Sequence, residues 1–157
     1  MRVNLPVTDN EYELPSGEVI ITRTDVRGNI EYANQAFFRS SGYDRAEVMG
    51  QPQNIIRHPD MPAAAFADMW ATIRGGTPWT GVVKNRRKDG GFYWVLANVT
   101  PVFQADKPAG YLSVRTKPAR EQIAAATRLY ADLQRGARSR WRLSGDGCRK
   151  IRVARWH

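Results

Sequence analysis

The sequence predicts an α+β domain with one five-stranded antiparallel sheet, helices on one face that enclose a ligand cavity, and a further helix on the C-terminal side. Two segments near the start and three after residue 78 alternate apolar and polar residues, whereas the region between them has helical periodicity. Strands, helices and strands in this order, within roughly 100 residues, are typical of one sheet with its helices on one face. The chain has 157 residues, 42% of them apolar, which is enough for one domain with a core.

The first expected elements are an arm and a hairpin. Residues 1–16 show no sustained period and contain two prolines, so we expect an extended arm. Residues 18–25 are rich in β-formers, residues 26–29 supply a turn, and residues 30–33 alternate apolar and polar. This pattern predicts two antiparallel strands joined by a short turn.

Three helices are expected next. Asn34 is a candidate N-cap for a short helix that ends at Gly42, and Asp44 with Glu47 resembles a capping box at the start of a second helix. Residues 61–74 form the clearest helix, because four bulky apolar residues fall at i, i+3, i+4 and i+7.

Three consecutive antiparallel strands are expected between Trp79 and Thr116, separated by turns at residues 88–91 and 106–108. After Pro118 the pattern becomes helical again. A short apolar stripe there consists of Ile123, Ala126, Tyr130 and Leu133. We expect this helix to be the exit from the domain.

The net charge of +9 belongs to the C-terminal part of the chain. Residues 1–116 hold 13 Lys and Arg against 12 Asp and Glu, whereas residues 117–157 hold 11 against 3. We therefore divide the chain into the N-terminal arm, a ligand-binding domain at 17–118, a helical linker at 119–135 and a basic tail at 136–157. The tail fits a nucleic-acid arm, a membrane-surface segment or a solvated tail, and the lack of a recognisable nucleic-acid motif favours the last.

The residue patterns of common catalytic and metal centres are missing from the sequence. It has no nucleophile elbow, phosphate-binding loop, zinc-binding histidine pair or dinucleotide fingerprint, and its two histidines cannot supply a multi-histidine metal site. A single cysteine, Cys148, excludes an intramolecular disulfide, and neither a leader nor an apolar run of about 18 residues is found. We therefore expect a cytoplasmic protein that is not an enzyme.

The most informative stretch, residues 54–62, places a cation, an imidazole and a carboxylate just before the clearest helix. Because a helix N-terminus presents free N–H groups, Arg57 and His58 beside it suit a phosphate or another anion. Two alternatives stay open. The alternative for His58 is a loop histidine that is bonded to the backbone. The alternative for Asp60 is the helix N-cap rather than a ligand contact.

Polar and aromatic residues on the later strands give further candidates. Trp79, at the start of a strand, either stacks on a flat ligand or belongs to the core. Asn85 and Asn98 lie on strands with one buried face, where an amide needs a partner such as the edge of a heteroaromatic ring. Solvent exposure is the alternative for both asparagines.

The motifs, taken in order, resemble the PAS family. The general resemblance is carried by Tyr32–Phe37, Ser41–Tyr43, Glu47–Gly50, Lys88–Gly90 and Tyr93–Val95. A narrower resemblance, to the sensory PAS domain of bacterial aerotaxis receptors, covers roughly residues 17–135. It is carried by Gly50–Asn54, Arg57–Pro62, Ala65–Trp70, Pro78–Trp79 and Val83–Lys88.

The resemblance implies a non-covalently bound FAD, with FMN the less favoured flavin, that reports redox state without catalysis. The FAD-binding positions of the family map onto Arg57, His58, Asp60 and Trp79, all present here. Asn85 matches a further family position, and Asn34 is added to the cofactor-site residues because signalling changes would be felt there. Reduction turns flavin N5 from an acceptor into a donor, so a nearby amide would reverse its hydrogen bond.

The resemblance also implies partners. Members of the family continue into a membrane anchor, a HAMP domain and a kinase-control domain. We therefore expect redox or oxygen sensing whose signal passes to those modules, and through them to a chemotaxis histidine kinase and its coupling protein. The expected place is the inner face of the cytoplasmic membrane, and pairing of two PAS domains is a further expectation.

Other hypotheses stay open. One is a PAS sensor of haem or another small ligand, with His58 as the axial ligand. Another is a basic protein that binds nucleic acid through residues 138–157, which we favour less. A light-oxygen-voltage photoreceptor is disfavoured, because its adduct-forming cysteine has to lie in the cavity and the sequence offers Cys148 alone.

Overall fold

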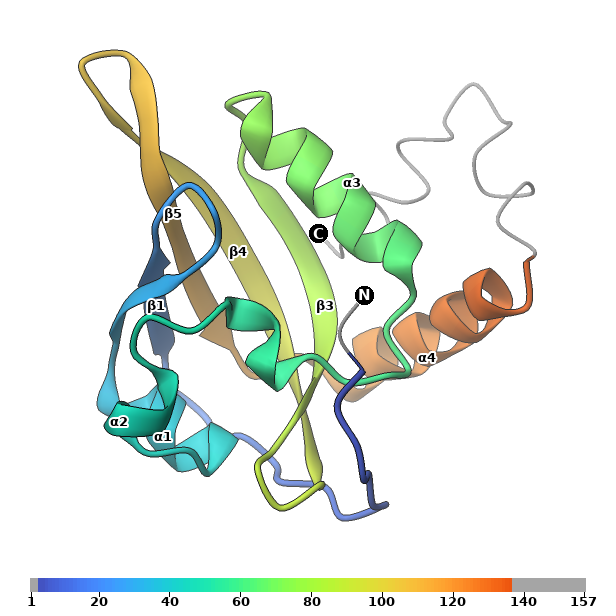
Figure 1. Cartoon of the computed structure of the whole chain (residues 1–157). Coiled ribbons are helices and arrows are strands. Elements are labelled where there is room, and N and C mark those ends of the chain that lie inside the picture. Colours follow the sequence, from blue (N-terminus) through green and yellow to red (C-terminus); the bar gives the residue numbers. More distant parts are fainter. Residues whose placement is uncertain (1–2, 137–157) are drawn as a thin grey trace.

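The computed structural model describes residues 3–136, which contain one five-stranded antiparallel sheet with the strand order β2-β1-β5-β4-β3 (Figure 1). The strands are β1 (Ile20–Thr24), β2 (Ile30–Ala33), β3 (Trp79–Arg86), β4 (Phe92–Gln104) and β5 (Lys107–Thr116). The helices are α1 (Gln35–Ser41), α2 (Arg45–Val48), the 3-10 helix η1 (Gln53–Ile56), α3 (Ala63–Arg74) and α4 (Arg120–Gln134). The predicted α+β fold class is confirmed.

The chain from α1 to α3 connects the two edge strands, β2 and β3, and crosses one face of the sheet (Figure 1). α1 packs against β1, and α3 packs against β3 and β4. The core contains side chains from both layers. Its largest completely buried members include Tyr93, Phe37, Leu14, Ile20, Ile30 and Met61.

Local sequence signals determine the short helices. Asn34 caps α1 by accepting a hydrogen bond from the Phe37 N–H at 3.2 Å. Gly42 ends this helix with φ of 77°, a left-handed conformation that glycine adopts without strain. Asp44 and Glu47 form the capping box predicted for α2, with bonds of 2.9 and 3.0 Å.

The apolar stripe predicted for the last helix is its packing face. Ala126, Tyr130 and Leu133 are buried, and Ile123 is partly buried against the core. α4 packs against β3, where the Tyr130 hydroxyl donates to the Val82 carbonyl at 2.5 Å. Because β3 is an edge strand, this bond satisfies a carbonyl that has no neighbouring strand on that side.

The N-terminal segment is extended and also packs on the domain. Glu11 forms a parallel bridge with Phe92 of β4, and the Tyr12 N–H donates to the Phe92 carbonyl at 2.7 Å. Leu14 is 2% exposed and belongs to the core. Contacts over such a separation in the sequence leave no local pattern, so the sequence indicated only an arm.

The last hairpin is tighter than predicted. Ala105 and Asp106 alone join β4 to β5, with φ of 52° and 63°, so β5 begins at Lys107 and not at Gly110. Pro108 therefore lies inside the strand, next to an irregularity in the register. The expected turn at residues 106–108 was wrong because two-residue turns with positive φ usually contain glycine or asparagine.

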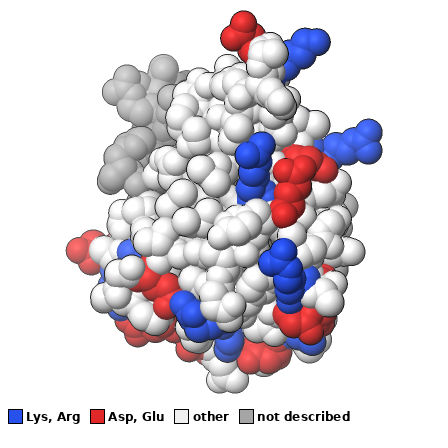
Figure 2. All heavy atoms as spheres, turned by 90° about the vertical axis from the view of Figure 1, so that its left-hand side faces the viewer, with Lys and Arg blue, Asp and Glu red and all other residues white. Residues whose placement is uncertain are grey.

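Charges on the described surface are mixed in sign. Figure 2 shows basic and acidic side chains interspersed on one face. Oppositely charged side chains of the described residues also form ion pairs, such as Lys88–Glu47 at 2.6 Å. Within residues 3–136, no helix combines the length and apolar character needed to cross a membrane. The predicted basic tail, apart from Gly136, lies outside the described residues, as does Cys148.

Candidate functional site

A cavity of about 210 Å³ lies between α3, η1 and the sheet. Its wall is mostly apolar and includes Phe66 and Trp70 of α3 and Val95 of β4. Pockets that enclose a whole drug-sized ligand measure roughly 300–1,000 Å³. The cavity is therefore suited to one part of such a ligand, and the remainder would extend past the exposed residues Arg27 and Asn54 at its mouth.

The charged groups that line the cavity are basic. Arg27 is exposed, Arg57 is half-buried and Arg115 is 2% exposed. None of the described lining residues is acidic. This lining favours a ligand that carries negative charge or many hydrogen-bond acceptors.

Arg57 lies in the segment between η1 and α3 and is one of the residues that line the cavity. Its backbone forms an isolated antiparallel bridge with Asn85 of β3, and its carbonyl accepts from the Asn4 side chain at 2.9 Å. The guanidinium lies 4.0 Å from the centroid of the Phe66 ring. Burial lowers the pKa of Arg57, and its Nη2 is buried without a hydrogen-bond partner. A ligand acceptor would satisfy this donor.

His58 follows Arg57 but does not line the cavity. Its ring is buried, its Nδ1 accepts from the Asp60 N–H at 3.0 Å, and its edge lies against Phe92. Burial first, and the positive charge of Lys84 next, lower the pKa of His58 from 6.5 to about 4. The structure therefore places His58 as a neutral loop histidine bonded to the backbone.

Asp60 is exposed and also lies outside the cavity lining. Its carboxylate pairs with Lys84 of β3 at 2.8 Å. Partial burial raises the pKa of Asp60, but the hydrogen bond and charge of Lys84 outweigh it and lower the pKa overall. The alternative role as helix N-cap was wrong, because α3 begins at Ala63 after Pro62, and Asp60 lies too early to reach its first N–H groups.

Trp79 is buried in the core and also lines the cavity, so the core alternative holds and stacking on a flat ligand stays a prediction. Its indole N–H donates to the Asp68 carboxylate of α3 at 3.0 Å. The ring lies against Gly81, where an added Cβ would be 2.3 Å from a ring atom. Because its N–H is engaged, Trp79 presents ring surface to a ligand and not a hydrogen-bond donor.

The asparagines on the strands lie in different surroundings. Asn85 is 4% exposed and lines the cavity. Its backbone forms the bridge with Arg57. Asn98 is exposed, and its amide donates to the Thr80 hydroxyl at 3.0 Å. Asn85 is therefore placed to meet a ligand, whereas the solvent-exposed alternative holds for Asn98.

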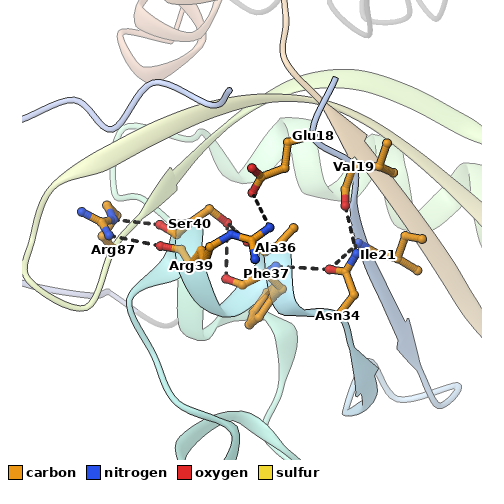
Figure 3. Close-up of polar contacts among 9 residues, drawn as sticks. All are labelled: Glu18, Val19, Ile21, Asn34, Ala36, Phe37, Arg39, Ser40 and Arg87. Carbon is orange, nitrogen blue, oxygen red and sulfur yellow. Dashed lines mark hydrogen bonds and ion pairs between the residues drawn. The ribbon is translucent and has the colours of Figure 1, made fainter. Parts of the chain in front are cut away.

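Asn34 lies away from the cavity lining and joins α1 to β1 (Figure 3). Its Oδ1 accepts from the N–H groups of Phe37 and Ile21, at 3.2 and 3.1 Å. Its Nδ2 donates to the Val19 carbonyl at 2.9 Å. Both ends of the amide are thus held by backbone, as expected for a residue that fixes the position of a helix on a strand.

Arg115 of β5 is a lining residue that sequence reasoning missed. Its Nε donates to the Ser113 hydroxyl at 3.0 Å and its Nη2 to the Thr22 hydroxyl, whereas its Nη1 is buried without a partner. Burial lowers the pKa of Arg115 to about 10, so it remains a cation at pH 7. The spacing of residues in the strand could have indicated Arg115. Tyr111, Ser113 and Arg115 are two residues apart, so their side chains lie on the same face of β5, which lines the cavity.

Comparison with known proteins agrees with this architecture. A family model described as "PAS fold" matches residues 30–115. The aerotaxis receptor of Escherichia coli K12 is 47% identical over 134 residues, which make up 85% of this chain and 26% of the receptor. The chain thus spans about a quarter of the length of that relative.

Solved structures share the fold. The light-oxygen-voltage protein of Rhodobacter sphaeroides aligns with a TM-score of 0.60 and 27% identity, covering 88% of this chain and 85% of that one. A light-oxygen-voltage domain studied with a flavin analogue aligns with a TM-score of 0.61 and 23% identity, covering 73% and 87%. Because the family model matches more than half of the chain, the chain belongs to the PAS family.

Proposed function

We propose that this chain is a redox-sensing PAS module that binds a flavin non-covalently in the cavity, with FAD preferred over FMN. The observation that carries the proposal is the buried, unpartnered Nη2 of Arg57 in a cavity with no acidic lining residue among those described. Similarity to an aerotaxis receptor supports a sensory role, and a domain of this fold studied with a flavin analogue supports the ligand class.

The residues of the cavity fit a flavin with a phosphate tail. Arg57 would bind a phosphate near the mouth, because a half-buried guanidinium with a free donor is suited to that group. Trp79 would offer its ring surface to a flat ring system, and Asn85 would meet a ring edge with its amide. Reversible uptake of electrons is the chemistry that a bound flavin would supply.

The other proposed site residues act on the position of these groups. His58 and Asp60 hold the segment that carries Arg57, through the bond between them and through the pair of Asp60 with Lys84. Asn34 couples α1 to β1 and would sense a change in the sheet. We propose that these three residues affect flavin binding or signalling indirectly.

The output of the module is proposed to leave through α4. A HAMP domain and a chemotaxis histidine kinase with its coupling protein are the proposed receivers, at the inner face of the cytoplasmic membrane. This part rests on similarity to the aerotaxis receptor, of which the chain covers 26%. Haem is disfavoured as the ligand, because His58, the axial ligand that the sequence offered, lies outside the cavity lining.

The visible spectrum of the purified full chain tests the proposal. We expect a yellow protein whose flavin bands bleach with dithionite, and mass spectrometry of the released cofactor distinguishes FAD from FMN. A Soret band would identify haem instead, and a colourless protein that takes up neither FAD nor FMN on reconstitution would contradict the proposal.

Variants test the site itself. Arg57→Ala removes a charge-assisted bond worth about 1.5–3 kcal/mol, so we expect flavin affinity to fall roughly 10- to 100-fold. Trp79→Ala should also lose flavin, and circular dichroism checks that both variants fold. Arg128→Ala, on the exposed side of α4, is the control for loss of one cation. Full flavin occupancy in both site variants would remove the assignment.

A further inference from the structure

The cations of the cavity are graded by depth. Arg27 is exposed at the mouth, Arg57 is half-buried, and Arg115 is 2% exposed on the sheet. A phosphate group carries full charge and strongly prefers water, whereas a flat heteroaromatic ring is mostly apolar and enters deeper. A ligand with both parts would therefore place its phosphates near Arg27 and Arg57 and its ring near Arg115.

Arg115 is held firmly but is incompletely bonded. Hydroxyls on two neighbouring strands, Thr22 of β1 and Ser113 of β5, accept from two of its nitrogens, and the Thr22 hydroxyl donates in turn to Gln53 of η1 at 3.3 Å. The Nη1 remains buried and unpartnered. Among residues 3–136, no carboxylate forms an ion pair with Arg115, and its partners Ser113 and Thr22 are neutral. The titratable group that acts on Arg115, Tyr93 of β4, stays uncharged at pH 7 because burial raises its pKa to about 12.

A buried cation without a counter-ion is unfavourable for folding, and an apolar residue of similar size is often neutral or stabilising in its place. The fixed guanidinium with one unpartnered nitrogen therefore has the form of a preorganised site for a group that carries negative charge part of the time. An acceptor in the cavity would complete the bonding of Nη1.

Resting on the proposed flavin function, we propose that Arg115 binds the pyrimidine edge of the flavin, at N1 and the C2 carbonyl, and favours the reduced ring. Two electrons from an external donor, dithionite in the assay below, and one proton taken up at N5 leave the reduced ring with one negative charge on N1 and the C2 carbonyl. The Arg115 cation offsets this charge, whereas the oxidised ring is neutral and gains less. A charge near N1 is a recognised means by which proteins tune a flavin.

The test compares Arg115→Met, Arg115→Lys and the surface control Arg128→Gln in the full chain loaded with FAD. Met keeps volume without charge, Lys keeps the charge, and Arg128 is exposed on α4. The preference for reduced over oxidised flavin is the ratio of the two binding constants. We expect this ratio to be at least tenfold lower in Arg115→Met than in the wild type. For a two-electron couple, this tenfold change is about 30 mV toward a lower midpoint potential.

A pH series adds a readout that a purely structural role would not move. In the wild type the reduced ring is expected to be anionic at neutral pH, with one proton taken up per two electrons. At low pH the flavin takes up two protons per two electrons, and at higher pH it takes up one. The pH of this change should be higher in Arg115→Met than in the wild type, and in Arg115→Lys it should stay near the wild-type value.

The outcomes separate the two proposals. If the wild type binds no flavin, the proposed function fails. If the wild type binds flavin and Arg115→Met matches Arg128→Gln in potential and pH profile, the Arg115 inference alone fails. If Arg115→Met fails to fold while Arg115→Lys folds, the cation serves the fold and the inference is overturned.

Discussion

Lowering the pH from 7 to 4 should destabilise the protein through His58. The ring is 2% exposed, and its Nδ1 accepts the Asp60 N–H at 3.0 Å. Burial, and after it the charge of Lys84, lower the pKa of His58 to about 4, whereas in the unfolded chain it is about 6.5. Between these values the unfolded chain binds a proton that the folded chain does not.

The free energy of unfolding therefore falls as the pH falls through this window. Above pH 6.5 His58 is neutral in both the folded and the unfolded chain, so its full contribution to the free energy of unfolding is present. The pKa difference of about 2.5 units, at 1.36 kcal/mol per unit, corresponds to about 3 kcal/mol by pH 4.

Urea denaturation from pH 7 to pH 4 measures this effect, with His58→Asn as the matched variant. The Asn Oδ1 lies where Nδ1 does and can accept the same N–H, but it does not titrate. We expect the stability of the wild type relative to His58→Asn to fall by about 3 kcal/mol across the range. Parallel profiles would refute the reasoning that His58 is buried as a neutral ring.

Two further variants test the packing around the site. Asn34→Ala removes the cap of α1 and the bonds to β1, so the free energy of unfolding should fall by about 2 kcal/mol, whereas Asn34→Asp keeps the accepting oxygen and should lose less. Equal stability of both variants and the wild type would show that this amide does not hold the two elements. Gly81→Ala places a methyl 2.3 Å from the Trp79 ring, so the ring should move, its fluorescence should change and flavin affinity should fall. Unchanged flavin affinity would separate the ring position from ligand binding.

The parts of the fold that the sequence predicted are those with local causes. The caps at Asn34 and Asp44 act within three residues, and strand alternation reports which face is buried. The packing of Leu14 and the pairing of Glu11 with Phe92 depend on residues far away in the chain. No local pattern could have shown them.

The site was predictable to a similar extent. The position of Arg57 beside a helix start follows from its local sequence, but the separation of roles between Arg57 and His58 does not, because it depends on which side of the segment meets Phe92. Arg115 was missed for a different reason. A charged residue on a strand is ordinarily assigned to the solvent face, and its burial requires the hydroxyls of Thr22 and Ser113.

The two functions of the proposed sensor, ligand binding and output, meet at the outer edge of β3. The Arg57 backbone bridges to Asn85 on this strand, and the Tyr130 hydroxyl of α4 bonds to Val82 three positions earlier. The last turn of α4 also reaches the site segment itself, since Gln134 donates to the Pro59 carbonyl at 3.2 Å. If Arg57 shifts when the ligand binds or is released, the residues that follow it would move against α4 directly. Under the proposed function, a signal would then reach the exit helix without a change in the whole sheet, and the short path through Pro59 and β3 is the one that variants should probe first.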